Sequence, residues 1–172
     1  MPKFEFLPSL PEYAETLFSW RKDPTALKHN PLDRLDFKAY NELLTKFGHD
    51  LSQLDKYNKF CWAVKHQNEI VCVVSIHNID TRMLTTHIGY TVAPTHYNRG
   101  FGGKIVSLMV DKIFNETKIR KVSALVHIEN LASQKILDKL GFKREGVLRQ
   151  HFLINDQPVD EIYFGLLKNE RL

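Results

Sequence analysis

One stretch of the chain, residues 87–109, constrains the fold more than any other. It begins with a strand-like segment, His87 to Ala93, which Pro94 ends because proline has no N–H to donate to a ladder. Apolar residues then recur at helical spacing from Ile105 to Ile113, which predicts a helix that begins near Gly102. The junction is rich in glycine, so backbone N–H groups can approach a ligand, and the helix N-terminus adds a partial positive charge. Strand, glycine loop and helix together predict a phosphate-binding site.

Two common phosphate-binding loops do not fit this stretch. A mononucleotide P-loop places Ser or Thr after its Gly-Lys pair to hold Mg²⁺, whereas Ile105 follows Gly103 and Lys104 here. A dinucleotide fingerprint that started at Gly100 would need a third glycine at the position of Ile105. The predicted phosphate-binding loop is therefore neither a mononucleotide P-loop nor a dinucleotide fingerprint.

The rest of the chain alternates between helix-like and strand-like segments. Asp36 and Asn130 are predicted to cap helices, and Gly48 and Gly141 are predicted to end them. Helices are predicted at 11–20, 25–29, 36–47, 103–116 and 130–140, and strands at 4–7, 60–64, 70–79, 83–92, 122–126, 143–150 and 161–167, with a turn at 155–158. The helix between two strands at 83–126 indicates a βαβ-type unit in a mixed sheet. We expect a single α/β domain over residues 1–172.

Composition excludes several classes of protein. The 172 residues are 43% hydrophobic and 26% charged, enough for one domain with its own core. The longest apolar run, 70–74, is too short to span a membrane, and no signal peptide is recognisable, so we expect a cytoplasmic protein. Cys61 and Cys72 lack CxxC spacing and are expected to be buried thiols, and no metal site is expected. The net charge of +4 suits an anionic cofactor as well as a nucleic acid.

Two motifs resemble one known family. Gly100-x-Gly102, behind a strand that reads Ile-Gly-Tyr-x-Val-x-Pro at 88–94, is similar to the pyrophosphate loop of the GNAT family of N-acetyltransferases. Tyr97 stands where that loop usually carries Gln or Arg, and an aromatic residue there is common in the RimJ/RimL-like ribosomal-protein acetyltransferase branch. Asn130-x-x-Ser133, followed by Lys-x-Gly-Phe-x-x-Glu-Gly at 139–146, resembles the same branch.

The resemblance covers nearly the whole chain and implies a fold and a cofactor. The fold would be a GNAT-like mixed, mostly antiparallel central sheet flanked by helices. The cofactor would be acetyl-CoA or CoA, with its pyrophosphate on the backbone of the glycine loop and its pantetheine arm beside the preceding strand. The cofactor-binding residues are then Tyr90, Val92, Arg99, Gly100, Phe101, Gly102, Gly103, Lys104, Asn130 and Ser133. A branched side chain at Gly102 is predicted to occupy the place of the phosphates.

Ser133 is the candidate donor to the departing CoA thiolate. With Asn130 as N-cap it falls in the first turn of its helix, close to the positive end of the helix dipole. Other branches of the family use a tyrosine four residues further on, where this chain has Leu137. A serine in a first turn also serves to satisfy local backbone groups, so a purely structural role stays open.

His87 is the candidate general base. It precedes Ile88, at a place where many GNAT relatives carry a glutamate, and an imidazole with a pKa of about 6.5 can take a proton through water. Phe152 stands where the RimL-like branch carries another carboxylate. A half-exposed strand histidine without a catalytic role, and an amine that arrives already neutral, are the alternatives.

Three functions remain open from the sequence. The first is transfer of an acetyl group from acetyl-CoA to a primary amine, a protein N-terminal α-amine or a small-molecule amine, by direct attack on the thioester. The second is a CoA-binding sensor or interaction module, suggested by the missing carboxylates. The third, a nucleic-acid binder, rests only on the net positive charge. We expect an amine acceptor, no membrane or nucleic-acid partner, and a monomer or homodimer.

Overall fold

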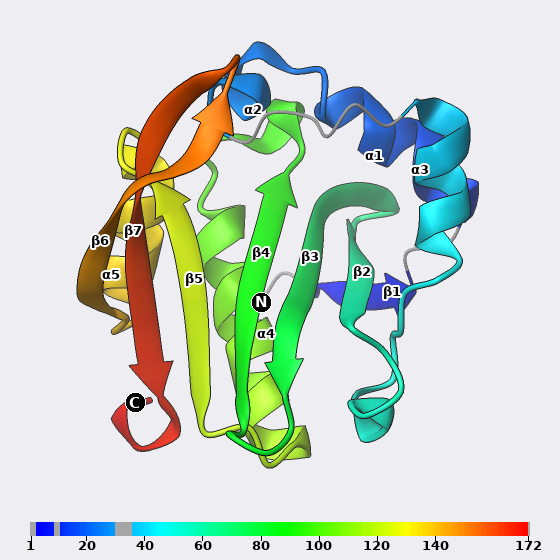
Figure 1. The fold of residues 1–172 in the computed structure, drawn as a ribbon. Coiled ribbons are helices and arrows are strands. Elements are labelled where there is room, and N and C mark those ends of the chain that lie inside the picture. The colour runs from blue at the N-terminus through cyan, green and yellow to red at the C-terminus, as the bar shows by residue number, and fades with distance from the viewer. Residues whose placement is uncertain (1–2, 9–10, 30–35, 172) are drawn as a thin grey trace.

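Seven strands form one sheet with the order β1-β2-β3-β4-β5-β7-β6 (Figure 1). The computed structural model describes residues 3–8, 11–29 and 36–171. The strands are β1 (Glu5–Pro8), β2 (Lys59–His66), β3 (Glu69–Asp80), β4 (Thr85–Val92), β5 (Lys121–His127), β6 (Lys143–Ile154) and β7 (Gln157–Leu167). The helices are α1 (Ala14–Trp20), α2 (Pro24–His29), α3 (Phe37–Leu44), α4 (Phe101–Glu116) and α5 (Leu131–Lys139). All neighbouring strands are antiparallel except β4 and β5, which confirms the mixed, mostly antiparallel sheet.

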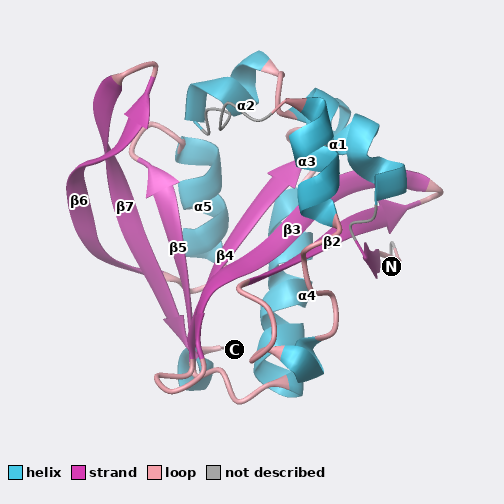
Figure 2. Cartoon of the chain, turned by 45° about the vertical axis from the view of Figure 1, so that its right-hand side comes forward, coloured by secondary structure: helices cyan, strands magenta, loops and turns pink. Residues whose placement is uncertain are grey.

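Helices pack on both faces of the sheet (Figure 2). The apolar side of α4 packs against β3 and β4, and its residues Ile105, Met109 and Ile113 are fully buried in the main core. On the opposite face α1 and α3 pack together, and their smaller core reaches the sheet through Val73 of β3. Since side chains alternate along a strand, Val74 faces the main core instead. The sheet therefore has one hydrophobic core on each face, the main core under α4 and the smaller core under α1 and α3.

β4 and β5 are parallel, with α4 as their crossover, as the βαβ pattern predicts. They pair over only three residue pairs, Thr85 with Lys121, Thr86 with Val122 and His87 with Ser123. Beyond these pairs the two strands diverge toward their carboxyl ends (Figure 1). The sheet thus opens at the edge where both strands lead into helices.

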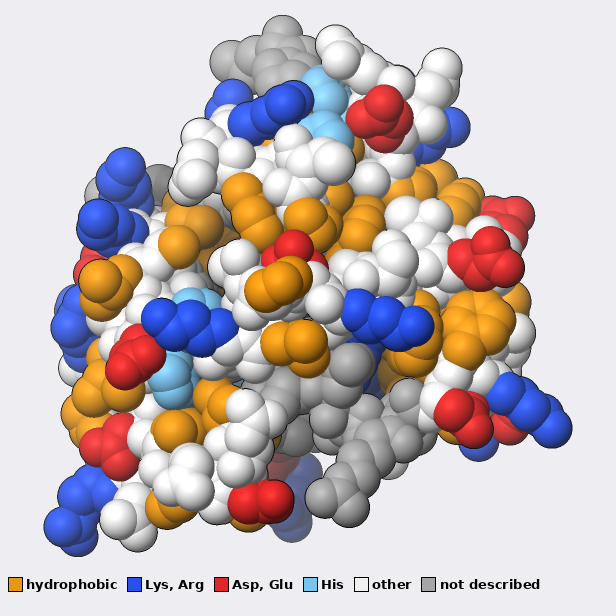
Figure 3. Space-filling model, turned by 90° about the horizontal axis from the view of Figure 1, so that it is seen from above, with side chains coloured by type: hydrophobic (Ala, Val, Ile, Leu, Met, Phe, Trp, Pro, Cys, Tyr) orange, Lys and Arg blue, Asp and Glu red, His pale blue; other side chains and the backbone are white. Residues whose placement is uncertain are grey.

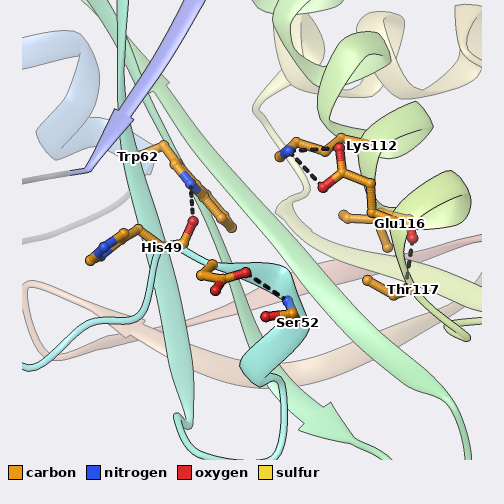
Figure 4. Close-up of polar contacts among 8 residues, drawn as sticks. His49, Ser52, Trp62, Lys112, Glu116 and Thr117 are labelled. Atoms are coloured by element: carbon orange, nitrogen blue, oxygen red, sulfur yellow. Dashed lines mark hydrogen bonds and ion pairs between the residues drawn. The ribbon is translucent and has the colours of Figure 1, made fainter.

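The structure confirms most of the predicted helix caps and ends. The Asp36 carboxylate accepts the N–H of Ala39 at 2.8 Å and caps α3, and Gly141 follows α5 with a left-handed φ of 86°. The C-terminus of α4 is closed by Thr117, whose hydroxyl donates to the carbonyl of Ile113 at 2.7 Å (Figure 4). Cys61 and Cys72 are both buried thiols, as expected.

Gly48 does not end a helix, contrary to the sequence prediction. α3 ends at Leu44, and Gly48 forms a β-bridge with Phe60 instead. A Cβ on Gly48 would lie 2.5 Å from a carbon of the Phe60 ring, so the glycine is needed for close packing of this loop on β2. The loop is fixed further by Trp62, which donates its Nε1–H to the carbonyl of His49 at 2.9 Å (Figure 4).

The C-terminal hairpin is longer than the sequence predicts. β6 and β7 are joined by only Asn155 and Asp156, with φ values of 49° and 61°, as a two-residue type I′ turn requires. Register shifts at 144–146 and 148–152 interrupt the alternation of β6, so the sequence pattern predicts this strand only as far as residue 150. Pro158 is tolerated in β7 because β5 pairs only with residues 161–167 of that strand.

Candidate functional site

The first turn of α4 is open to a ligand. Gly100 is its N-cap residue with a left-handed φ of 75°, and no described side chain caps the helix. A Cβ on Gly100 or Gly103 would meet nothing within 4 Å, and both Arg99 and Lys104 are exposed. The first amide groups of a helix have no intrahelical acceptor, so those of 101–103 are available to an anion. Uncapped N–H groups, open glycines and two cations fit the pyrophosphate of CoA.

Gly102 has a different role from the one the sequence suggested. Its Cβ would lie 3.0 Å from Cδ1 of Ile136, 3.4 Å from Cγ2 of Val92 and 3.6 Å from Cε2 of Tyr90. These atoms belong to α5 and β4, so the position faces the interior and not the open loop. A side chain at Gly102 would therefore not occupy the place of the phosphates, because the helix begins at Phe101 and turns this residue inward.

Gly102→Val is accordingly expected to lower the free energy of unfolding by about 1–3 kcal/mol, because it overpacks the contact between α4, α5 and β4. Urea unfolding measures the change. Gly103→Ala is the matched control and should raise stability by about 0.5–1 kcal/mol, since its Cβ points into open space within a helix. Equal stability of Gly102→Val and the wild type would contradict the inward packing.

Ser133 lies at the N-terminus of α5, as predicted. The side-chain oxygen of Asn130 accepts the N–H of Ser133 at 3.1 Å, which makes Asn130 the N-cap. The Ser133 hydroxyl does not bond to its own first turn: its Oγ lies 2.9 Å from Oη of Tyr90 on β4. Leu137, at the position where other branches are expected to carry a tyrosine, is fully buried in the core.

Tyr90 joins the two helix N-termini. Its hydroxyl contacts Ser133 of α5, and its ring borders the position of Gly102 in α4. Burial raises the pKa of Tyr90 to about 12, and the hydrogen bond with Ser133 opposes part of that rise. The phenol therefore keeps its proton at neutral pH and can donate to Ser133. Sequence analysis placed Tyr90 beside the cofactor but missed this bond, because no local pattern signals a contact between β4 and α5.

His87 lies apart from this pair. Side chains alternate along β4, so His87 and Tyr90 point to opposite faces, with Cα atoms about 10 Å apart. The Nε2 atom of His87 lies 3.2 Å from Oη of Tyr163 on β7, and its Nδ1 is buried without a hydrogen-bond partner in the described part of the chain. Of the two ring nitrogens of His87, Nε2 is therefore the one with a hydrogen-bond partner, the Tyr163 hydroxyl.

Two histidines face each other on this side of the sheet. The rings of His77 and His87 are 5.7 Å apart on the paired strands β3 and β4. Burial, and then the positive charge of Lys121, lowers the pKa of His87 below its ordinary value of 6.5. Burial lowers the pKa of His77 to about 4, with smaller contributions from Lys59 and His87. Both imidazoles are therefore neutral at pH 7.

Other polar residues that attract attention have structural partners. Glu145 pairs with Lys121 at 2.6 Å, and the Asp160 carboxylate accepts the N–H of Gln150 at 2.8 Å. Within residues 3–8, 11–29 and 36–171, no group of three or more His, Cys, Asp or Glu side chains is placed to hold a metal ion. None of the described helices is long and apolar enough to cross a membrane.

A mixed sheet that opens between two parallel strands, with two helix N-termini at the opening, agrees with the CoA-binding acetyltransferase fold that the two sequence motifs resemble. A family model described as an acetyltransferase (GNAT) domain matches residues 5–143, and the chain belongs to this family. Enzymes of the family use acetyl-CoA, so this protein is an acetyl-transferring enzyme.

Relatives agree with this assignment. The uncharacterized N-acetyltransferase p20 of Bacillus licheniformis is 28% identical over 159 residues, which cover 92% of this chain and 89% of the relative. The ribosomal-protein-S5-alanine acetyltransferase of Vibrio fischeri has a similar fold, with a TM-score of 0.84 at 21% identity over 100% of this chain and 97% of that chain. The spermidine N-acetyltransferase of Vibrio cholerae, solved with CoA and spermine, has a TM-score of 0.83 at 17% identity over 97% and 96% of the two chains. At these identities, the similarity to the two solved structures indicates a shared fold and no more.

Proposed function

We propose that this enzyme acetylates a primary amine, either a protein N-terminal α-amine or a small-molecule amine, by direct attack of the amine on the acetyl-CoA thioester. The observation that carries the proposal is the 2.9 Å contact between Tyr90 Oη and Ser133 Oγ where the two helix N-termini converge. A hydroxyl with a neutral phenol behind it, at the positive end of a helix, is suited to meet a leaving thiolate.

Each part of the opening has a separate role in this proposal. Backbone N–H groups of the first turn of α4 bind the pyrophosphate, aided by Arg99 and Lys104, and Val92 borders the pantetheine arm. The amine nitrogen forms a bond to the carbonyl carbon, and the carbon–sulfur bond breaks. Ser133 donates a hydrogen bond to the sulfur, and Tyr90 donates to Ser133. The nitrogen gives up one proton, and CoA leaves as the thiol.

The acceptor side is proposed to lie on the face of the sheet that carries His87. We propose residues 20–60 and 152–160 as its walls, of which residues 30–35 lie outside the described residues. Where β6 bulges, the hairpin forms an open depression of about 680 Å³ lined by Val147, Leu148, Arg149, Gln150, His151 and Asp160. The bulged hairpin is thus one candidate wall for the amine-bearing molecule.

Thiol release tests the proposal. Acetyl-CoA is mixed with the protein, a thiol reagent and one amine from a panel of spermidine and short peptides that begin with Ser or Ala. Amine-dependent release of CoA thiol is the expected result. Saturable CoA binding without thiol release for any amine would favour the CoA-binding sensor instead.

A nucleic-acid-binding function has no support on the face that Figure 3 shows. Lys and Arg side chains there are spread among acidic and apolar ones and do not form a continuous basic surface. Nucleic-acid binding relies on clustered positive charge, and its affinity falls steeply with salt.

If His87 is the water-linked base, the pH profile of kcat/KM should have an acidic limb whose pKa lies below 6.5, because burial and Lys121 lower the pKa of this imidazole. Activity is then constant near pH 7 and falls as His87 becomes protonated. His87→Gln should remove this limb and leave CoA affinity unchanged, and Tyr163→Phe should shift it. His77→Gln, on the neighbouring strand, is the matched control. A profile that keeps the same limb in His87→Gln would show that the amine is delivered neutral without this base.

A further inference from the structure

The short helix α2 is held at its start by a tyrosine from another part of the chain. Asp23 precedes the helix, and its Oδ1 accepts the backbone N–H groups of Thr25 at 2.9 Å and Ala26 at 3.2 Å. The same oxygen accepts the hydroxyl of Tyr97 at 3.2 Å. Tyr97 lies just before Gly100, so this bond joins α2 to the loop that opens α4.

The other end of α2 contacts the segment that leads into α5. His29 Nδ1 lies 3.3 Å from Nδ1 of His127, the last residue of β5, and Lys28 lies 3.7 Å from the carboxylate of Glu129. The carbonyl of His127 accepts the N–H of Asn130 at 2.8 Å. The C-terminal end of α2 therefore contacts His127 and Glu129, which directly precede Asn130, the N-cap of α5.

α2 thus connects the segments that follow β4 and β5, the two strands that have diverged at this edge. Figure 1 shows the helix above the ends of both strands. Burial and the charge of Asp23 raise the pKa of Tyr97 to about 12, so its hydroxyl remains a donor at neutral pH.

We propose that Tyr97 and Asp23 are positioning residues that make α2 a strap across the diverging ends of β4 and β5, ordered by the binding of CoA. The inference rests on the proposed function, because it places CoA at the N-termini of α4 and α5. Pyrophosphate bound to the first turn of α4 restricts the loop that carries Tyr97. Tyr97 then holds Asp23, and through it the first turn of α2. An amine would meet a fixed wall only after CoA has bound.

Hydrogen exchange with CoA as the probe tests this coupling, measured from subsecond times because α2 is short. In the wild type, CoA should slow exchange both at 100–104 and at 24–29. In Tyr97→Phe, CoA should still protect 100–104, whereas its protection of 24–29 should fall by about ten-fold, the effect of losing one hydrogen bond to a charged group. Tyr57→Phe, on the loop before β2, is the matched control and should behave as the wild type. His29→Gln should weaken the same protection, and His49→Gln should not.

Three results would overturn the inference, and they are distinguishable. Protection at 100–104 but not at 24–29 in the wild type would leave the cofactor site in place and remove the coupling. An equal loss of protection in Tyr97→Phe with and without CoA would make the hydroxyl purely structural. Protection of neither segment would refute the proposed cofactor site itself.

Discussion

Ser133→Ala is expected to lower kcat by about 10²–10³-fold and to leave the dissociation constant of acetyl-CoA nearly unchanged. The expected size is that of removing one donor from a developing negative charge. The hydrogen bond to sulfur strengthens only as the carbon–sulfur bond breaks, so its loss acts on the transition state more than on the bound cofactor. Steady-state kinetics give kcat, and calorimetry with CoA gives the affinity.

Two further variants make this result specific. Tyr90→Phe keeps the ring against α4 and removes only the hydroxyl behind Ser133, so its loss of kcat should be smaller, about ten-fold or less. Ser19→Ala, whose exposed hydroxyl bonds within its own helix, is the matched control and should leave kcat unchanged. A raised KM with an intact kcat in Ser133→Ala would assign this residue to binding.

Gly103→Asp is expected to weaken CoA binding by about ten-fold or more. Its carboxylate would enter the open space at the first turn of α4, where the pyrophosphate is proposed to lie, and charges a few ångströms apart repel by more than about 1 kcal/mol near a protein surface. An acidic residue in a first turn is favourable for the helix, so the folded protein should be at least as stable as the wild type.

Gly103→Asn separates charge from bulk. It has nearly the same shape and should weaken CoA binding much less than Gly103→Asp. The difference between the two variants should shrink as salt is added, because ions screen exposed charges. Equal affinities for both variants in low salt, measured by calorimetry, would place the pyrophosphate elsewhere.

Local signals predicted the helices and their caps, because capping is decided by residues a few positions apart. Asp36 and Asn130 cap the helices that the sequence assigned to them. The prediction that Gly48 ends a helix was wrong. Glycine is required at this position because a Cβ would clash with the ring of Phe60 on a later strand. Both strands of the C-terminal hairpin were predicted, but β6 was predicted to end at residue 150, because its bulges interrupt the alternation that marks a strand.

The candidate site was predicted in its parts but not in its arrangement. The glycine loop and the Asn130–Ser133 turn were both identified from the sequence, and the fold brings them to one edge. The predicted direction of a side chain at position 102 was wrong. A shift of one or two residues in the start of a helix rotates each residue to a different face of that helix. The contacts of Tyr90 with Ser133 and of Tyr97 with Asp23 join distant segments, and only the topology of the sheet reveals them.

The brief pairing of β4 with β5 has a consequence for how substrate preference can change. The sheet consists of two antiparallel blocks, β1–β4 and β5–β7, which share only three residue pairs. One block is connected to α1–α3, and the other carries the long hairpin, so the two proposed walls around the amine belong to different blocks. A substitution where β4 pairs with β5, such as one at Thr86 or Ser123, can tilt one block of strands against the other. Such a tilt alters the spacing of the two proposed walls. Selectivity for a wider or narrower amine can thus arise far from any residue that touches it.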